Sequence, residues 1–203
     1  DTKLTQGPSR RSLGQRYIYF LVESPVNDNL DYSRFSGFFN WTMTYRRDSD
    51  VFTQSGRFLR RPEPQSVESI LRRVRGLPKK KLVAWVVSNC KTPSKREDYV
   101  SELQKHIPVD IFGNCGTKNC PGTRPNSECG SLLEREYMFY LAFENSECND
   151  YVSEKFFATM EVDIVPIVRG GANYSAIAPP GSYIDANDYS SAQELAEELK
   201  RLS

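Results

Sequence analysis

The chain has 203 residues, enough for one large domain or two small ones. Its 27 Lys and Arg nearly balance its 26 Asp and Glu, and the formal net charge of +1 excludes a strong bulk attraction to nucleic acid or to acidic membranes. Hydrophobic residues make up 38% of the chain, enough for a folded core, and no apolar run approaches the roughly 20 residues that cross a bilayer.

Few elements are predicted in the N-terminal third of the chain. Residues 1–15 are polar and are expected to form a disordered lead-in. Two stretches rich in β-branched and aromatic residues predict strands, the first of them buried: 16–24 (RYIYFLVES) and 41–45 (WTMTY). Residues 51–66 predict a loop, and residues 66–76 (SVESILRRVRG) predict a short helix that begins after a serine cap and ends before a glycine.

From residue 81 onward, strands and helices alternate. Apolar runs predict strands in five ranges: 81–89, 109–113, 137–146, 164–171 and 182–186. Amphipathic periodicity predicts helices at 94–107, from about 152, and at 190–202. This alternation predicts an α/β fold, a parallel sheet with helices on both faces.

Ligands of such sheets bind beyond the carboxyl ends of the strands. The predicted strand ends bring several polar residues and glycines to that rim: Glu23, Ser88, Asn89, Gly113, Glu144, Asn145 and Gly170. The polar stretch 144–151 at this rim leads into a helix N-terminus, where free backbone N–H groups favour an anion such as phosphate.

Five cysteines indicate an oxidising compartment. Three of them share a Gly/Pro/Asn-rich loop, NCGTKNCPGTRPNSECG: Cys115, Cys120 and Cys129. Such a loop has no core of its own, so disulfides are favoured there, whereas this spacing without a nearby His fits structural zinc poorly. Sequons make Asn40 and Asn173 N-glycosylation candidates and support a secretory history. The chain starts at Asp1 with neither Met nor a signal peptide, so we expect a piece of a longer protein.

Six blocks of the chain, in this order, resemble the α1,3-fucosyltransferases of glycosyltransferase family ten: LVESPVN, FFNWTMTYRRDSDV, LVAWVVSNC, FYLAFENSECNDYVSEKFF, VPIVRGGANYS and APPGSYIDANDYSSAQELA. The resemblance implies a GT-B fold of two Rossmann-like domains. Residues 1–76 would be part of the acceptor domain, and residues 77–203 a GDP-fucose-binding domain truncated at its C-terminal end. The resemblance also implies a type II membrane protein of the Golgi lumen, whose anchor and stem lie outside this chain.

The resemblance also implies roles for single residues. Glu23, at the end of the first strand, matches the family's proposed general base. Arg96 and Lys155 match its phosphate-binding cations, which suits the charge that builds up on a leaving diphosphate. Together with the strand-end residues, the expected GDP-fucose site comprises Tyr45, Ser88, Asn89, Arg96, Glu144, Asn145, Ser146, Tyr151, Glu154 and Lys155.

The implied reaction is an inverting transfer that requires no metal or other cofactor. Fucose would move from GDP-fucose in α1,3 linkage to GlcNAc of glycoprotein glycans. The cysteine pattern favours the N-glycan core, and a Lewis-type antenna is the alternative. Asp48–Ser49–Asp50 spells the DxD of Mn²⁺-dependent transferases but falls in the family's YRxDSD block, which is not a metal motif.

Two other function classes compete with this reading. A non-catalytic GDP-sugar-binding relic is disfavoured because Glu23, Arg96 and Lys155 are retained together. A Rossmann-type dehydrogenase is disfavoured because no G-x-G-x-x-G follows any predicted strand.

The pairing of the cysteines is a separate prediction. Cys90 and Cys148 each follow a predicted strand end at the same rim, and Lewis-type relatives tend to lack both. We therefore predict a Cys90–Cys148 disulfide. Cys115, Cys120 and Cys129 would then share one internal bridge and one leftover thiol.

Overall fold

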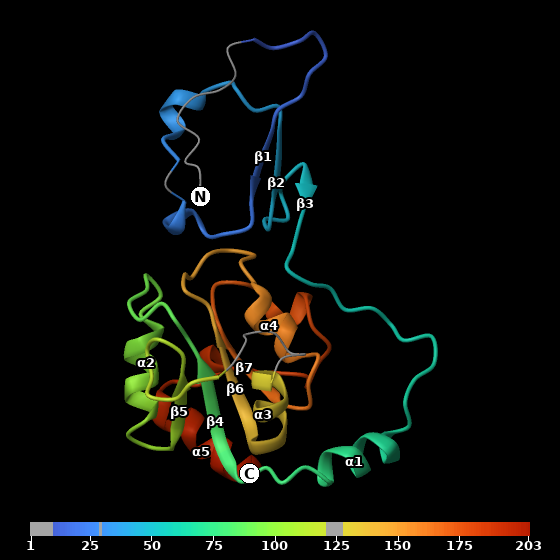
Figure 1. Cartoon of the computed structure of the whole chain (residues 1–203), viewed down its shortest axis with the longest axis vertical. Coiled ribbons are helices and arrows are strands. Elements are labelled where there is room, and N and C mark those ends of the chain that lie inside the picture. The colour runs from blue at the N-terminus through green and yellow to red at the C-terminus, as the bar shows by residue number, and fades with distance from the viewer. Residues whose placement is uncertain (1–9, 29, 121–127) are drawn as a thin grey trace.

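The computed structural model describes residues 10–28, 30–120 and 128–203, and it contains two units stacked along the longest axis of the molecule (Figure 1). Part of the expected lead-in, 1–9, and of the cysteine-rich loop, 121–127, lies outside the described residues.

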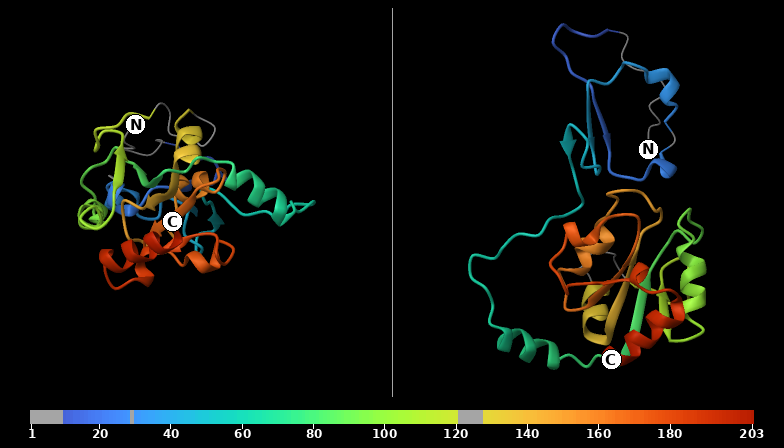
Figure 2. Two further views of the ribbon diagram at one scale, coloured as in Figure 1. Left: turned by 90° about the horizontal axis from the view of Figure 1, so that it is seen from below. Right: turned by 180° about the vertical axis from the view of Figure 1, so that it is seen from behind.

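The N-terminal unit is built on a small parallel sheet. Its strands pair in the order β1 (Ile18–Leu21), β2 (Trp41–Thr44) and β3 (Val51–Phe52). The connection from β1 to β2 contains two short 3-10 helices, η1 (Pro25–Asn27) and η2 (Tyr32–Phe35). After β3 an extended linker swings away from both units and leads to α1 (Val67–Arg75), as Figures 1 and 2 show. Helix α1 confirms the helix predicted at 66–76, with Ser66 accepting a hydrogen bond from the Ser69 N–H at 3.2 Å.

The C-terminal unit is a five-stranded parallel sheet between two layers of helices (Figure 2). Its strands are β4 (Lys81–Val86), β5 (Val109–Phe112), β6 (Tyr137–Phe143), β7 (Val165–Arg169) and β8 (Ile184–Asp185), in the spatial order β5-β4-β6-β7-β8. Its helices are α2 (Arg96–Leu103), α3 (Glu128–Glu136), α4 (Glu154–Thr159) and α5 (Ala192–Leu202), with the 3-10 helices η3 (Tyr174–Ala176) and η4 (Ala186–Asp188). The predicted α/β class and parallel sheet are confirmed.

The core of this unit explains why its strands read as unbroken apolar runs. Successive residues of a strand point to opposite faces of a sheet. One face, which includes Trp85 and Leu141, packs against α2 and α5 through residues such as Leu103 and Leu199. The opposite face packs against α3 and α4. Because both faces are covered, both sets of alternating residues must be apolar.

The N-terminal sheet is less buried than the sequence predicts. Strand β1 was expected to be buried, but Ile18 is 44% exposed and Phe20 is 58% exposed. The other face is covered by aromatic side chains of the β1–β2 connection, such as Phe39, whose ring centroid lies 5.4 Å from that of Tyr19. The described residues thus leave the face that carries Ile18 and Phe20 open to solvent, so its apolar pattern is not matched by burial.

Several elements differ from the predicted ones; α2, for example, spans Arg96–Leu103 rather than 94–107, and β6 ends at Phe143 rather than at residue 146. Strand β3 lies where a loop was expected, α3 was not predicted at all, and β4 ends at Val86 rather than at residue 89. Residues 87–89 instead begin the loop that leads toward α2.

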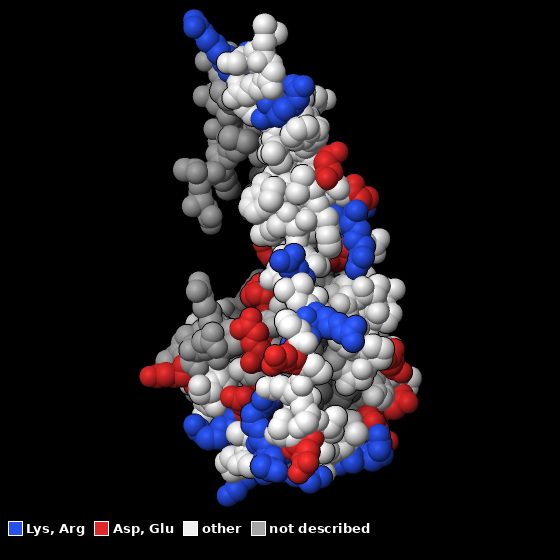
Figure 3. Space-filling view, turned by 90° about the vertical axis from the view of Figure 1, so that its right-hand side faces the viewer, with Lys and Arg blue, Asp and Glu red and all other residues white. Residues whose placement is uncertain are grey.

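The surface carries no block of single charge on the side seen in Figure 3, where Lys and Arg are interspersed with Asp and Glu over the lower unit. This distribution agrees with the net charge of +1. In the part of the chain that the structure describes, no helix combines the length and hydrophobicity that a bilayer crossing needs.

Candidate active site

The strand order of the C-terminal unit creates a crevice between β4 and β6. The chain runs from β4 outward to β5, and then crosses over to β6 and continues to β8 on the other side. Ligands of doubly wound sheets bind at this reversal point, beyond the carboxyl ends of the strands. A cavity of about 340 Å³ opens there. Six of the ten residues predicted to hold a nucleotide sugar line it: Ser88, Asn89, Arg96, Asn145, Glu154 and Lys155.

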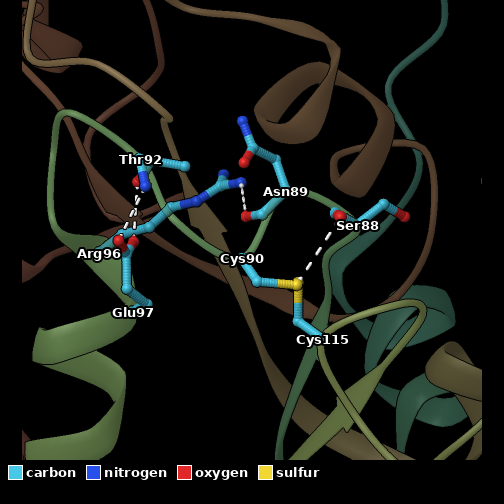
Figure 4. The surroundings of a disulfide bond; sticks show 7 residues. All are labelled: Ser88, Asn89, Cys90, Thr92, Arg96, Glu97 and Cys115. Carbon is cyan, nitrogen blue, oxygen red and sulfur yellow. Dashed lines mark hydrogen bonds between the residues drawn. A yellow bond between two sulfur atoms is a disulfide. The ribbon is translucent and has the colours of Figure 1, made fainter.

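Arg96 joins the two strands that flank the crevice. It is the first residue of α2, follows Lys95 in a left-handed conformation with φ of 49°, and is only 3% exposed. Its guanidinium donates to the carbonyl oxygen of Phe143 at 2.6 Å. It also donates to the carbonyl oxygen of Asn89 at 3.3 Å, the bond drawn in Figure 4. It lies over the Trp85 ring, with its Cζ 5.5 Å from the ring centroid.

The charge of Arg96 is not balanced by a direct ion pair. Among the described residues no carboxylate lies within ion-pair distance of its guanidinium, and its buried Nε has no hydrogen-bond partner. Burial lowers the pKa of Arg96 from its ordinary value, although arginine stays charged. A buried cation with an unused donor beside a cavity is a binding point for an anion.

Lys155 contributes a second cation to the same cavity. Its Nζ lies 2.8 Å from Ser153 Oγ and 3.4 Å from Glu144 Oε2. Ser153 caps α4 and donates from its N–H and its hydroxyl to the Glu144 carboxylate at 2.8 and 2.9 Å. Glu144 is fully buried and does not line the cavity, and burial raises its pKa, opposed by Lys155 and by the hydrogen bonds from Ser153. The buried Glu144 carboxylate thus holds the Lys155 ammonium in place, both directly and through Ser153.

The polar stretch between β6 and α4 also contacts the N-terminal unit. Glu23, just past β1, accepts a hydrogen bond on Oε1 from the Tyr151 hydroxyl. Its Oε2 accepts from Asn27 Nδ2 at 3.0 Å and from Asn145 Nδ2 at 3.4 Å. Because Asn145 also lines the cavity, the predicted general base lies one side chain away from the predicted donor site.

Tyr45 and Ser146, two further predicted site residues, lie beside the cavity without lining it. The Tyr45 ring is buried and stands edge-on to Tyr151, with 4.9 Å between ring centroids. Burial, with a hydrogen bond to Cys148, raises the pKa of Tyr45 to about 12. The buried Ser24 and Ser146 hydroxyls are 2.8 Å apart across the two units. Both site residues therefore hold the units together.

The predicted Cys90–Cys148 disulfide is wrong. Cys90 pairs with Cys115, and Cys148 is the free thiol. Strand β4 has β5 on one side and β6 on the other, so the cysteine after β4 can meet a partner from either loop. The loop after β5 turns back onto β4, because the Cys115 N–H donates to the Val87 carbonyl at 3.3 Å and Gly113 adopts a φ of +88°.

The predicted bridge inside the cysteine-rich loop is confirmed and joins Cys120 to Cys129. Cys129 also lines the cavity, while the Cys90–Cys115 bond follows directly on Asn89, whose carbonyl accepts from Arg96. Both disulfides therefore border the candidate site.

The DxD-like stretch is held by contacts within the β2–β3 segment. Asp48 pairs with Arg46, and Asp50 accepts from the Thr42 N–H at 2.7 Å and the Thr42 hydroxyl at 2.9 Å. Within residues 10–28, 30–120 and 128–203, no three His, Cys, Asp or Glu side chains gather in a way that could hold a metal ion.

Both candidate glycosylation sites lie on the surface. Asn40 and Asn173 are exposed, and the Ser175 hydroxyl of the second sequon donates to Asn173 Oδ1 at 2.7 Å.

A second hollow of about 890 Å³ lies elsewhere, between the linker, α1 and the segment before β7. It is lined by residues such as Arg60, Arg73, Glu134 and Asp163. This hollow lies at the amino ends of the strands, whereas ligands of this fold bind beyond the carboxyl ends. None of the residues predicted at the carboxyl ends of the strands lines it.

Comparison with known proteins identifies the family. The family model described as "Glycosyltransferase family 10 (fucosyltransferase) C-term" matches residues 77–203, and that described as "Fucosyltransferase, N-terminal" matches residues 1–56. The chain is 43% identical over 209 residues to alpha-(1,3)-fucosyltransferase C of Drosophila melanogaster, a match that covers 95% of this chain and 48% of that protein. It is 42% identical over 168 residues to glycoprotein 3-alpha-L-fucosyltransferase A of the same organism, covering 80% of this chain and 33% of that protein. The chain thus spans about half or less of the length of these relatives.

The fold has a solved counterpart. The structure described as "Crystal Structure of alpha1,3-Fucosyltransferase with GDP-fucose" aligns with a TM-score of 0.61 at 17% identity, covering 92% of this chain and 62% of that chain. This likeness confirms the expected GT-B type of fold. The crevice between β4 and β6, with its two cations, lies within residues 77–203, which the C-terminal family model matches. Together with the identity to both relatives, this match places the chain in glycosyltransferase family 10, the fucosyltransferases.

Proposed function

We propose that the complete protein is an inverting α1,3-fucosyltransferase that uses GDP-fucose. The observation that carries the proposal is the buried Arg96, which has no ion-pair partner among the described residues and shares a cavity with Lys155. Two cations that line the same cavity suit a diphosphate. The relatives are named as fucosyltransferases, and the solved structure of similar fold is named with GDP-fucose, which supports the same donor here.

The reaction divides between the two units. Glu23 takes the proton from the acceptor hydroxyl as that oxygen forms a bond to the anomeric carbon of fucose. The bond from this carbon to the β-phosphate oxygen breaks on the opposite side, and its electron pair leaves with GDP. Arg96 and Lys155 stabilise the negative charge that builds up there. Attack opposite to departure converts β-linked fucose into α-linked fucose.

The cavity-lining residues other than the cations bind the rest of the donor. Glu154, at the start of α4, has carboxylate oxygens that can accept from ribose hydroxyls. The buried Asn145 Oδ1 has no hydrogen-bond partner among the described residues, and it can accept from a donor hydroxyl.

The proposed transfer requires no metal, because the two cations supply the leaving-group charge. Activity should therefore persist in EDTA, and loss of activity that Mn²⁺ restores would contradict this part of the proposal.

The proposed acceptor is GlcNAc in the core of N-glycans on glycoproteins. The printed name of one relative, glycoprotein 3-alpha-L-fucosyltransferase A, supports a glycoprotein acceptor. A Lewis-type antenna is the second candidate, favoured by the 39% identity over 198 residues to a human 4-galactosyl-N-acetylglucosaminide 3-alpha-L-fucosyltransferase. The proposed location is the Golgi lumen, which the two disulfides support.

The test incubates the full-length protein with GDP-fucose and a panel of core and antennal N-glycans, and maps the linkage of each product. We expect α1,3-fucose on the core GlcNAc. Glu23→Gln keeps the shape of the side chain but cannot take the proton. It should bind GDP-fucose normally and transfer fucose about 10²- to 10⁴-fold more slowly. Binding of GDP-fucose without transfer by the wild type would favour a non-catalytic binding protein.

A further inference from the structure

Tyr151 is fully buried beside the cavity and does not line it. Its hydroxyl points across the boundary between the units and donates to Glu23 Oε1. The structure therefore pairs this tyrosine with the proposed base and not with the space for the donor.

The tyrosine is a permanent donor. Burial, with the hydrogen bond to Glu23, raises the pKa of the Tyr151 hydroxyl far above its ordinary value, so the proton stays on the hydroxyl at any working pH. The ring is fixed as well, because it stands edge-on to the buried Tyr45.

The other oxygen of the carboxylate is held independently. Glu23 Oε2 accepts from Asn27, which belongs to its own unit, and from Asn145 of the opposite unit. A carboxylate held at one oxygen can still rotate about that contact. The bond from Tyr151 to Oε1 adds the second fixed point and sets the plane of the carboxylate relative to the cavity.

We propose that Tyr151 is a positioning residue for Glu23, whose carboxylate it orients across the boundary between the two units. This inference rests on the proposed function, because it is the proposed transfer that gives Glu23 the role of base. It assigns Tyr151 to the transfer step and not to donor affinity.

The test compares Tyr151→Phe with a matched control, Tyr174→Phe, in the full-length protein. Tyr174 is also a fully buried tyrosine, but its hydroxyl finds no hydrogen-bond partner among the described residues. Removing the bond from Tyr151 to a charged group should lower kcat about 10- to 100-fold. The affinity for GDP, measured by titration, should stay within about twofold for both variants, and Tyr174→Phe should keep its kcat.

A double-mutant cycle separates positioning from a general structural role. If Tyr151 acts through Glu23, then Tyr151→Phe should lower kcat in the wild-type background but not further in the Glu23→Gln background. Additive losses, an unchanged kcat, or a loss of GDP affinity that matches the loss of kcat would each overturn the inference. Failure of the wild type to transfer fucose would overturn the proposed function and the inference with it, whereas normal transfer by Tyr151→Phe would overturn only the inference.

Discussion

Arg96 illustrates how burial turns an ordinary charge into a candidate binding group. Nothing in the sequence around it distinguishes it from a solvated arginine at the start of a helix. In the structure the left-handed Lys95 turns the chain at the start of α2, and the guanidinium reaches the ends of β4 and β6. This environment is set by strand order, which local sequence does not encode. The resemblance to a family is what pointed to the residue.

The two cations give the first prediction at the residue scale. Arg96→Ala and Lys155→Ala should each lower kcat/KM for GDP-fucose about 10²- to 10³-fold, because each removes a preorganised charge at the leaving group. Arg72→Ala is the control, since its side chain is 81% exposed on α1 and pairs only with the equally exposed Glu68. Near-normal kcat/KM in both cavity variants would contradict the assignment of the phosphate site.

Glu144 gives a prediction about pH and stability. Its pKa is raised in the folded protein, chiefly by burial, so the folded state holds this proton more tightly than the unfolded state. Its contribution to the free energy of unfolding must therefore fall as pH rises from about 4, the ordinary range of a glutamate, through the raised folded-state pKa.

Glu144→Gln removes this titration. The free energy of unfolding of the wild type minus that of Glu144→Gln, measured by urea denaturation, should therefore decrease as the pH is raised from about 4. Glu68→Gln, at an exposed glutamate of α1, should show no such trend. A difference that stays flat or rises with pH would count against a raised pKa at Glu144.

At the scale of elements, the sequence predicts the central strands well and the loops poorly. Strands β4, β6 and β7 are apolar on both faces, so each can be recognised from its own residues, without knowing which strands lie beside it. Helix α3 was missed because it follows a loop rich in Gly and Pro, and because Cys129 and Gly130 in its first turn are weak helix formers. Disulfide pairing was missed because it depends on which strand lies beside β4.

The two disulfides should stabilise the fold unequally. The Cys90–Cys115 bond closes a separation of 25 residues and the Cys120–Cys129 bond one of 9. In the chain-entropy view, serine at both positions of the first pair should cost about 3 to 4 kcal/mol of unfolding free energy, and of the second about 2 to 3 kcal/mol. Urea denaturation measures both losses. A non-reducing peptide map that links Cys90 to any residue other than Cys115 would refute the pairing.

At the scale of the whole molecule, the cavity belongs to one unit and the proposed base to the other. Every residue that lines the cavity lies between Val86 and Ile164, whereas Glu23 follows β1. The resemblance predicted this division. The contacts that join the units, such as the bonds of Tyr151 and Ser146, could not be predicted, because they depend on how two separately folded surfaces meet.

Separating the units should therefore abolish transfer and spare donor binding. Ser24→Trp places a large ring where two buried hydroxyls are 2.8 Å apart, so it should displace Glu23 from the cavity. We expect the rate of fucose transfer to fall at least about 100-fold, because a positioned general base contributes at least that factor to the rate. The affinity for GDP should be retained. Ser101→Trp, at an exposed position of α2, should change neither. Parallel losses of GDP binding and transfer would show that the cavity itself depends on the N-terminal unit.

The free thiol of Cys148 offers a way to observe the boundary between the two units by chemical labelling. The other four cysteines of this chain are locked in disulfides, so among its five cysteines a maleimide dye can label this half-buried thiol without any mutation. The thiol is only partly exposed and lies beside Tyr45 of the opposite unit, so we expect the dye to react faster when the two units separate. The rate of labelling should therefore respond to separation of the two units, and a donor that draws the units together would slow that rate.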